Sequence, residues 1–133
     1  MAVVMNAGKR ILVVDDSKPM TAFVAGILKA ANYEEVDRIH DGVSALALLR
    51  KKEYDLVITD VQMQPISGLE LTRLIKADAQ LRKVRVILTG SHGWDDLASL
   101  DCADGYVTKP IEPRDLKEKV ADVLATVAQL ASG

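Results

Sequence analysis

Short, unbroken apolar runs alternate with longer segments of helical periodicity along the whole chain. Residues 11–14 read Ile-Leu-Val-Val and residues 56–58 read Leu-Val-Ile. Runs of this kind are typical of strands that are buried on both faces of a sheet. The same pattern, with a weaker second member, predicts five strands at residues 11–14, 36–39, 55–59, 84–89 and 105–108.

A segment with apolar residues at helical spacing follows each expected strand. Ser17 is the expected N-cap of the first helix and Pro19 stands in its first turn. Ser67 and Glu70 have the spacing of a capping box at the start of the third helix. The second helix is expected to begin at Asp41-Gly42, a short fourth helix to cover 95–100, and a fifth to begin at Pro113. The positions expected to face the sheet are Met20, Phe23, Val24, Ile27 and Leu28; Val43, Leu46, Ala47 and Leu49; Leu71, Leu74 and Ile75; and Leu116, Val120, Val123, Leu124, Val127 and Leu130.

Strict alternation of strand and helix predicts an α/β fold, a doubly wound (βα)5 parallel sheet with helices on both faces. The crossovers are expected to be right-handed. In such sheets the functional crevice lies beyond the carboxyl ends of the strands, where the strand order reverses. One domain is expected over residues 1–133, with a core over about 9–130.

The composition narrows the class of protein. A formal net charge of -2 argues against a nucleic-acid-binding surface, which is normally basic. No apolar run approaches the ~18 residues that span a bilayer. The single cysteine, Cys102, cannot form an internal disulfide. We therefore expect a cytoplasmic protein with no membrane partner.

Charged and hydroxyl side chains follow the expected strands at one edge of the sheet. Asp15 and Asp16 end the first strand, Asp60 the third and Thr89 the fourth, and Lys109 follows the fifth. Two carboxylates ~4 Å apart repel by about 4 kcal/mol at an effective dielectric constant near 20. A bound cation would relieve this repulsion, and an all-oxygen site without His or Cys suits Mg²⁺ better than zinc.

The same residues are those that phosphoryl transfer requires. A carboxylate such as Asp60 can act as the nucleophile and form an acyl phosphate. Lys109 and Mg²⁺ would neutralise the phosphoryl oxygens, and the Thr89 hydroxyl would donate a hydrogen bond to one of them.

Four motifs resemble the receiver domain of two-component response regulators, the CheY-like family. They are Val-Asp-Asp-Ser at 14–17, Thr-Asp-Val-Gln-Met at 59–63 with Gly68, Leu-Thr at 88–89, and Tyr-Val-Thr-Lys-Pro at 106–110. The resemblance covers about residues 9–130. It implies a flavodoxin-like sheet with strand order 2-1-3-4-5.

The resemblance also implies roles for the site residues. Asp60 would accept the phosphoryl group from the phosphohistidine of a sensor histidine kinase or phosphotransfer protein. Mg²⁺ would bind Asp16, Asp60 and the backbone carbonyl of Gln62, with Asp15 acting mostly through a water. Lys109 would contact the phosphoryl oxygens. The chain would then be a phosphoacceptor and not a true enzyme.

Thr89 and Tyr106 would form the switch of such a domain. Thr89 would move to the phosphate and Tyr106 would turn inward behind it. The fourth helix, fifth strand and fifth helix would bind a downstream protein effector, and the chain is expected to be a monomer or weak dimer.

The chain departs from the family pattern in the loop after the third strand and beside the switch threonine. Gln64 stands before Pro65, where the family usually has Pro directly after the Met. Gly90 stands where the family commonly has Ala, and together with Gly93 it predicts a mobile loop. The segment between Thr89 and Lys109 is short, so the fourth helix is expected to be truncated or irregular.

Other interpretations remain open at this stage. Taken alone, Asp15-Asp16 is a turn and helix cap, and Thr89 is a β-branched strand residue. An aspartyl-nucleophile phosphatase would need a second Asp two residues after the nucleophile, where this chain has Ser17 and Gln62. A non-phosphorylated, receiver-like interaction module would lack Mg²⁺ binding.

Overall fold

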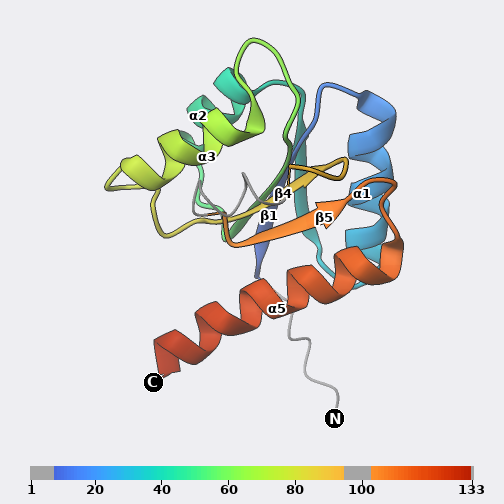
Figure 1. Ribbon diagram of the computed structural model, residues 1–133. Helices are drawn as coiled ribbons and strands as arrows, with labels where there is room; N and C mark the ends of the chain where they lie inside the picture. The colour runs from blue at the N-terminus through green and yellow to red at the C-terminus, as the bar shows by residue number, and fades with distance from the viewer. Residues whose placement is uncertain (1–7, 95–102, 133) are drawn as a thin grey trace.

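A parallel sheet of five strands forms the centre of the computed structural model, which describes residues 8–94 and 103–132 (Figure 1). The strand order is β2-β1-β3-β4-β5 and every pair is parallel. Both findings confirm the predicted fold. The strands are β1 (Arg10–Val14), β2 (Glu35–Ile39), β3 (Leu56–Asp60), β4 (Arg85–Gly90) and β5 (Gly105–Thr108).

Side-chain caps start the helices where the sequence predicts them. The Ser17 hydroxyl accepts a hydrogen bond from the Met20 amide, and the Ser67 hydroxyl accepts one from the Glu70 amide. The predicted helix at 95–100, residue Cys102 and the side chains of Val127 and Leu130 lie outside the described part of the chain. The described helices are α1 (Lys18–Ala30), α2 (Gly42–Lys51), α3 (Gly68–Ala77) and α5 (Pro113–Ser132).

Helices α1 and α5 cover one face of the sheet, and α2 and α3 cover the other (Figure 1). The residues of β1 show why its apolar run is unbroken. Ile11 and Val13 pack in the α1–α5 core, while Leu12 and Val14 pack in the α2–α3 core. Each fully buried side chain of this size stabilises the fold by roughly 1.5–3 kcal/mol. The sheet is therefore a rigid support for the residues at its edge.

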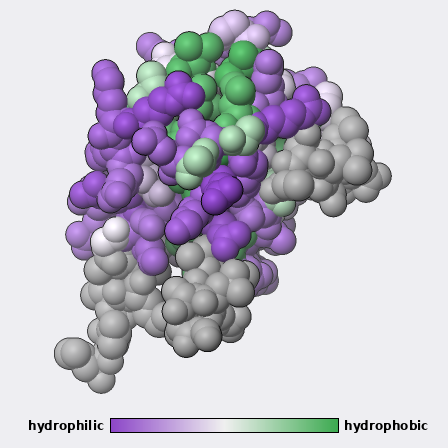
Figure 2. Space-filling model, turned by 90° about the vertical axis from the view of Figure 1, so that its left-hand side faces the viewer, coloured by the Kyte–Doolittle hydropathy of each residue, from purple (hydrophilic) through white to green (hydrophobic). Residues whose placement is uncertain are grey.

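Four of the positions expected to face the sheet are exposed instead, because the buried stripe of each helix is narrower than its apolar pattern. Phe23 is 45% exposed, Val43 53% and Leu74 41%, and Ala47 is exposed as well. Each lies one or two residues from a buried position, which places it about 100–200° around the helix axis. Figure 2 looks onto the α2 and α3 side and shows green apolar surface near its top.

Among the described residues, no helix has the length and apolar character needed to cross a bilayer.

Candidate functional site

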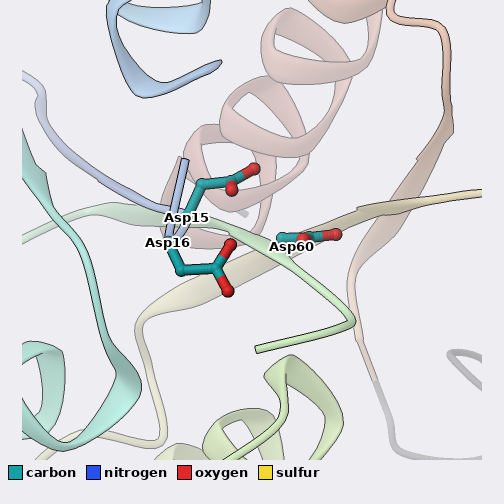
Figure 3. Close-up of side chains that lie close together, drawn as sticks. All are labelled: Asp15, Asp16 and Asp60. Carbon is teal, nitrogen blue, oxygen red and sulfur yellow. The ribbon is translucent and has the colours of Figure 1, made fainter. Parts of the chain in front are cut away.

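Three carboxylates meet at the carboxyl edge of the sheet (Figure 3). Asp15 and Asp16 directly follow β1, and Asp60 is the last residue of β3. One carboxylate oxygen from each lies within 4.8 Å of those of the other two. Asp15 and Asp60 are buried and Asp16 is exposed. The structure thus brings together the acidic residues predicted from the strand ends.

Lys109 joins two of these carboxylates. Its Nζ lies 3.3 Å from Asp15 Oδ2 and 3.2 Å from Asp60 Oδ1. The backbone fixes where this side chain starts, because the Lys109 amide donates to the Gly90 carbonyl at 2.7 Å. With all three acids ionised, the ammonium leaves two negative charges unbalanced. The site is therefore built to attract further positive charge.

Burial of the Asp15 carboxyl raises its pKa above the ordinary value. The negative charge of Asp60 acts in the same direction. The Ser17 amide, which donates to Asp15 Oδ1 at 2.9 Å, and the Lys109 ammonium act against it. The net effect disfavours the ionised form of Asp15, and a bound cation would favour it.

The donor set fits Mg²⁺. A hard divalent cation would balance the two remaining charges, and it prefers oxygen ligands. One carboxylate oxygen from each acid lies within 4.8 Å of those of the other two, so Asp16 and Asp60 would be close enough to contribute ligands to one ion. The exposed Asp16 shares a cavity with Gln62, which gives water access to the same place.

Gly68 has a role that its sequence position does not reveal. A Cβ atom built on Gly68 would lie 2.0 Å from the Asp60 carbonyl oxygen and 3.1 Å from Val61 Cα. The Gly68 amide also donates to the Val61 carbonyl at 2.8 Å. The start of α3 therefore lies directly on the backbone that carries Asp60. The sequence signals are its place in the motif of residues 59–68 and its position directly after the N-cap Ser67, and neither shows the contact with Asp60.

The two predicted switch residues, Thr89 and Tyr106, differ in burial and in the groups they face. Thr89 is buried and stands opposite Asp60 in the β3–β4 register. Tyr106 is partly buried, and its hydroxyl donates to the Ser91 carbonyl at 2.7 Å.

The prediction that Gly90 belongs to a loop is wrong, because Gly90 is the buried last residue of β4 and pairs with Thr108. Gly93 has a positive φ of 100°, as glycine in a turn allows.

Comparison with known proteins identifies the family. A sequence model of the response regulator receiver domain matches residues 11–121, most of the chain. The chain belongs to the response regulator receiver family. This receiver domain is 30% identical over 123 residues to chemotaxis protein CheY-3 of Vibrio cholerae, and the match covers 90% of this chain and 95% of CheY-3. It therefore takes part in two-component signalling.

Solved structures are similar in fold. The chemotaxis response regulator CheY4 of Vibrio cholerae matches the receiver domain with a TM-score of 0.79 and 27% identity, over 86% of this chain and 98% of that one. The signal receiver domain of a signal transduction histidine kinase from Syntrophus aciditrophicus matches with a TM-score of 0.82 and 32% identity, over 90% and 92% of the two chains. The resemblance inferred from the four motifs is confirmed.

Proposed function

We propose that Asp60 accepts a phosphoryl group from the phosphohistidine of a sensor histidine kinase or phosphotransfer protein, with Mg²⁺ bound beside it. The position of Lys109 carries this proposal. Its ammonium lies 3.2 Å from one oxygen of Asp60 and also binds Asp15, so a cation is already held beside the candidate nucleophile. Asp60 also has the most central position of the three acids, because it ends β3 and β3 lies between β1 and β4 in the sheet.

In the proposed step, a carboxylate oxygen of Asp60 attacks phosphorus and a P–O bond forms. The P–N bond of the donor phosphohistidine breaks, and its electron pair goes to the imidazole nitrogen, which takes a proton from solvent. The products are an acyl phosphate on Asp60 and a neutral histidine on the donor. Lys109 stabilises the charge on the phosphoryl oxygens, and Thr89 stands where its hydroxyl can donate to one of them.

We assign Mg²⁺ to Asp16, Asp60 and the backbone carbonyl of Gln62, with Asp15 acting through a water. When bound, the ion would supply positive charge to the phosphoryl oxygens. The support for this assignment is the all-oxygen donor set, the close spacing of the carboxylates and the exposure of Asp16.

Labelling with a small acyl phosphate tests the assignment. The protein should take up one phosphoryl group in Mg²⁺ and lose this ability in EDTA or as Asp60→Asn. Asp115→Asn is the matched control, because Asp115 is an exposed aspartate in the first turn of α5. Undiminished labelling of Asp60→Asn would overturn the assignment.

Steady release of phosphate would distinguish an aspartyl-nucleophile phosphatase from a phosphoacceptor. Such an enzyme would use a general acid two residues after its nucleophile, where this chain has Ser17 and Gln62. We therefore propose a phosphoacceptor and expect at most one phosphoryl group per chain with acyl phosphate, and no turnover of phosphate monoesters. A chain that binds no Mg²⁺ would instead be a receiver-like interaction module.

We propose that Thr89 responds to the phosphoryl group and that Tyr106 relays this response to a downstream protein effector. Phosphorylation adds negative charge and acceptor oxygens at Asp60, which would draw the Thr89 hydroxyl and Lys109 toward it. Tyr106 lines a groove between β5 and α5. A movement of Tyr106 after phosphorylation would therefore alter the shape of this groove. Cytoplasmic location and a monomeric or weakly dimeric state stay predictions.

A further inference from the structure

A hollow of about 410 Å³ lies beside the acidic cluster, between the segments that follow β1, β3 and β4. Asp16 lines it from the first of these segments, Gln62 and Met63 from the second, and Trp94 from the third. We call it the Trp94 hollow. Its volume falls within the range of small-molecule sites, roughly 300–1,000 Å³. Because Asp16 belongs to both features, the Trp94 hollow adjoins the acidic cluster of Figure 3.

Apolar side chains form much of the wall of the Trp94 hollow. Val61, Met63 and Leu69 are buried residues that line it. Trp94 is half-buried and packs against the α2–α3 core, which holds its side chain in place. Aromatic side chains bind other planar rings by stacking and edge-to-face contacts. The hollow is therefore suited to a flat group that carries little charge.

The charge of the Trp94 hollow disfavours an anion. Among the described residues that line it, Asp16 is negative and none is cationic. The polar residues Gln62, Gln64 and Ser67 supply amide and hydroxyl groups. A neutral imidazole, with one N–H donor and one acceptor nitrogen, can hydrogen-bond to such groups. A carboxylate in the same place would face the negative charge of Asp16.

The position of Lys109 leaves the side of the hollow open to a donor. The Lys109 ammonium lies 3.2 Å from Asp60 Oδ1 and 3.3 Å from Asp15 Oδ2, so it occupies the β5 side of the cluster. Asp16 is the exposed acid and lies on the side of the hollow. In phosphoryl transfer the leaving group lies roughly in line with the nucleophile, across the phosphorus. A donor that approaches past Asp16 therefore brings its leaving group to the hollow.

We propose that the Trp94 hollow is the subsite for the imidazole ring of the phosphoryl donor, and that Trp94 makes the chain favour an imidazole over an acyl leaving group. An Asp60 oxygen bonds to phosphorus as the P–N bond breaks. The electron pair of that bond stays on the ring nitrogen, which takes a proton from solvent, and the neutral ring remains packed on Trp94. A leaving acetate would instead carry negative charge beside Asp16 and has no ring to stack. The inference rests on the proposed function of Asp60.

Two small donors with different leaving groups test the selection. Monophosphoimidazole and acetyl phosphate are each supplied with Mg²⁺, and the ratio of their second-order rates of labelling Asp60 is measured. Trp94→Ala should lower this ratio by about fivefold through slower labelling by monophosphoimidazole. Trp94→Leu, which keeps apolar packing, should lower it similarly, and Trp94→Phe should restore most of it. A purely structural role of Trp94 would slow both donors alike, and the unchanged ratio would overturn the proposal.

Phe23→Ala is the matched control for the loss of an aromatic side chain. Phe23 is 45% exposed on α1 and does not line the Trp94 hollow. Its replacement should leave the ratio of the two rates unchanged. A fall in the ratio equal to that of Trp94→Ala would overturn the assignment of selection to the hollow.

Free imidazole tests the subsite without any phosphoryl transfer. Trp94 is the single tryptophan, so its fluorescence reports on the hollow directly. Imidazole should change this fluorescence along a saturable curve, whereas N-acetyltryptophanamide in solution should respond linearly. A linear response of the protein would overturn the subsite.

The failure of the inference is distinguishable from the failure of the proposed function. A chain that both donors label at Asp60, with a ratio of rates that Trp94→Ala does not change, would overturn the selection by Trp94 alone. A chain that neither donor labels would overturn the proposed function and the selection together.

Discussion

Replacing Gly68 with alanine should damage both the stability and the chemistry of the domain. The new Cβ would lie 2.0 Å from the Asp60 carbonyl oxygen and 2.9 Å from its carbonyl carbon. Neither atom is the flexible end of a side chain, so α3 or the end of β3 must shift by roughly 1 Å to restore an ordinary contact distance. Asp60 is part of the backbone that would be displaced.

The cost can be worked from three terms. Overpacking against a rigid neighbour costs about 1–3 kcal/mol. Weakening the hydrogen bond from the Gly68 amide to the Val61 carbonyl costs about 1 kcal/mol more. The better helix propensity of alanine returns up to about 1 kcal/mol. We therefore expect a loss of about 2 kcal/mol in the free energy of unfolding, which lowers Tm by about 4–8 °C in a chain of this size.

Urea unfolding measures the effect of Gly68→Ala on stability, and Mg²⁺-dependent phosphoryl labelling measures its effect on the chemistry at Asp60. Gly26→Ala is the control, because Gly26 is exposed inside α1 and a Cβ there meets no atom within 4 Å. It should stabilise the domain by about 0.5–1 kcal/mol and leave labelling unchanged. A Gly68→Ala protein as stable as the parent, and labelled at the same rate, would refute the reasoning about this close approach.

Three further outcomes are expected. Lys109→Met should slow labelling of Asp60 by about 10²-fold, measured with a small acyl phosphate, because it removes the positive charge beside the nucleophile. Mg²⁺ should change the fluorescence of Trp94, the single tryptophan, which shares a cavity with Asp16, and Asp16→Asn should abolish this change. Hydrogen bonds from Lys52 and Tyr54 lower the pKa of Asp37 from 3.8. Asp37→Asn should therefore lose stability at neutral pH, and urea titrations should show the difference closing as pH falls through the lowered pKa.

The sheet and its order are readable from sequence because apolar runs and helical spacing repeat in a fixed alternation. The carboxyl ends of parallel strands share one edge, so Asp15, Asp16 and Asp60 had to lie near one another. Exposure of Phe23 and Val43 was not predictable from the same pattern. Helical spacing marks an apolar side, whereas the position of the neighbouring strands decides how wide a stripe is covered.

The roles of the glycines were not readable, because each depends on a contact between distant segments. A Cβ atom on Gly68 would meet the backbone of Asp60, and a Cβ atom on Gly90 would meet the hydroxyl of Tyr106. A glycine in sequence indicates conformational freedom, but it does not say what occupies the space of the missing side chain. For Gly90 the sequence suggested a mobile loop, while the structure shows a buried strand end.

The central claim is that Asp60 is the phosphoacceptor, and locating the acyl phosphate in the chain tests it most directly. Borohydride reduces an aspartyl phosphate to homoserine, which peptide mass spectrometry can place. After treatment with acetyl phosphate and Mg²⁺, homoserine should be found at position 60 and at neither Asp15 nor Asp16. Homoserine at one of those two positions, or at none in protein shown to bind Mg²⁺, would contradict the account.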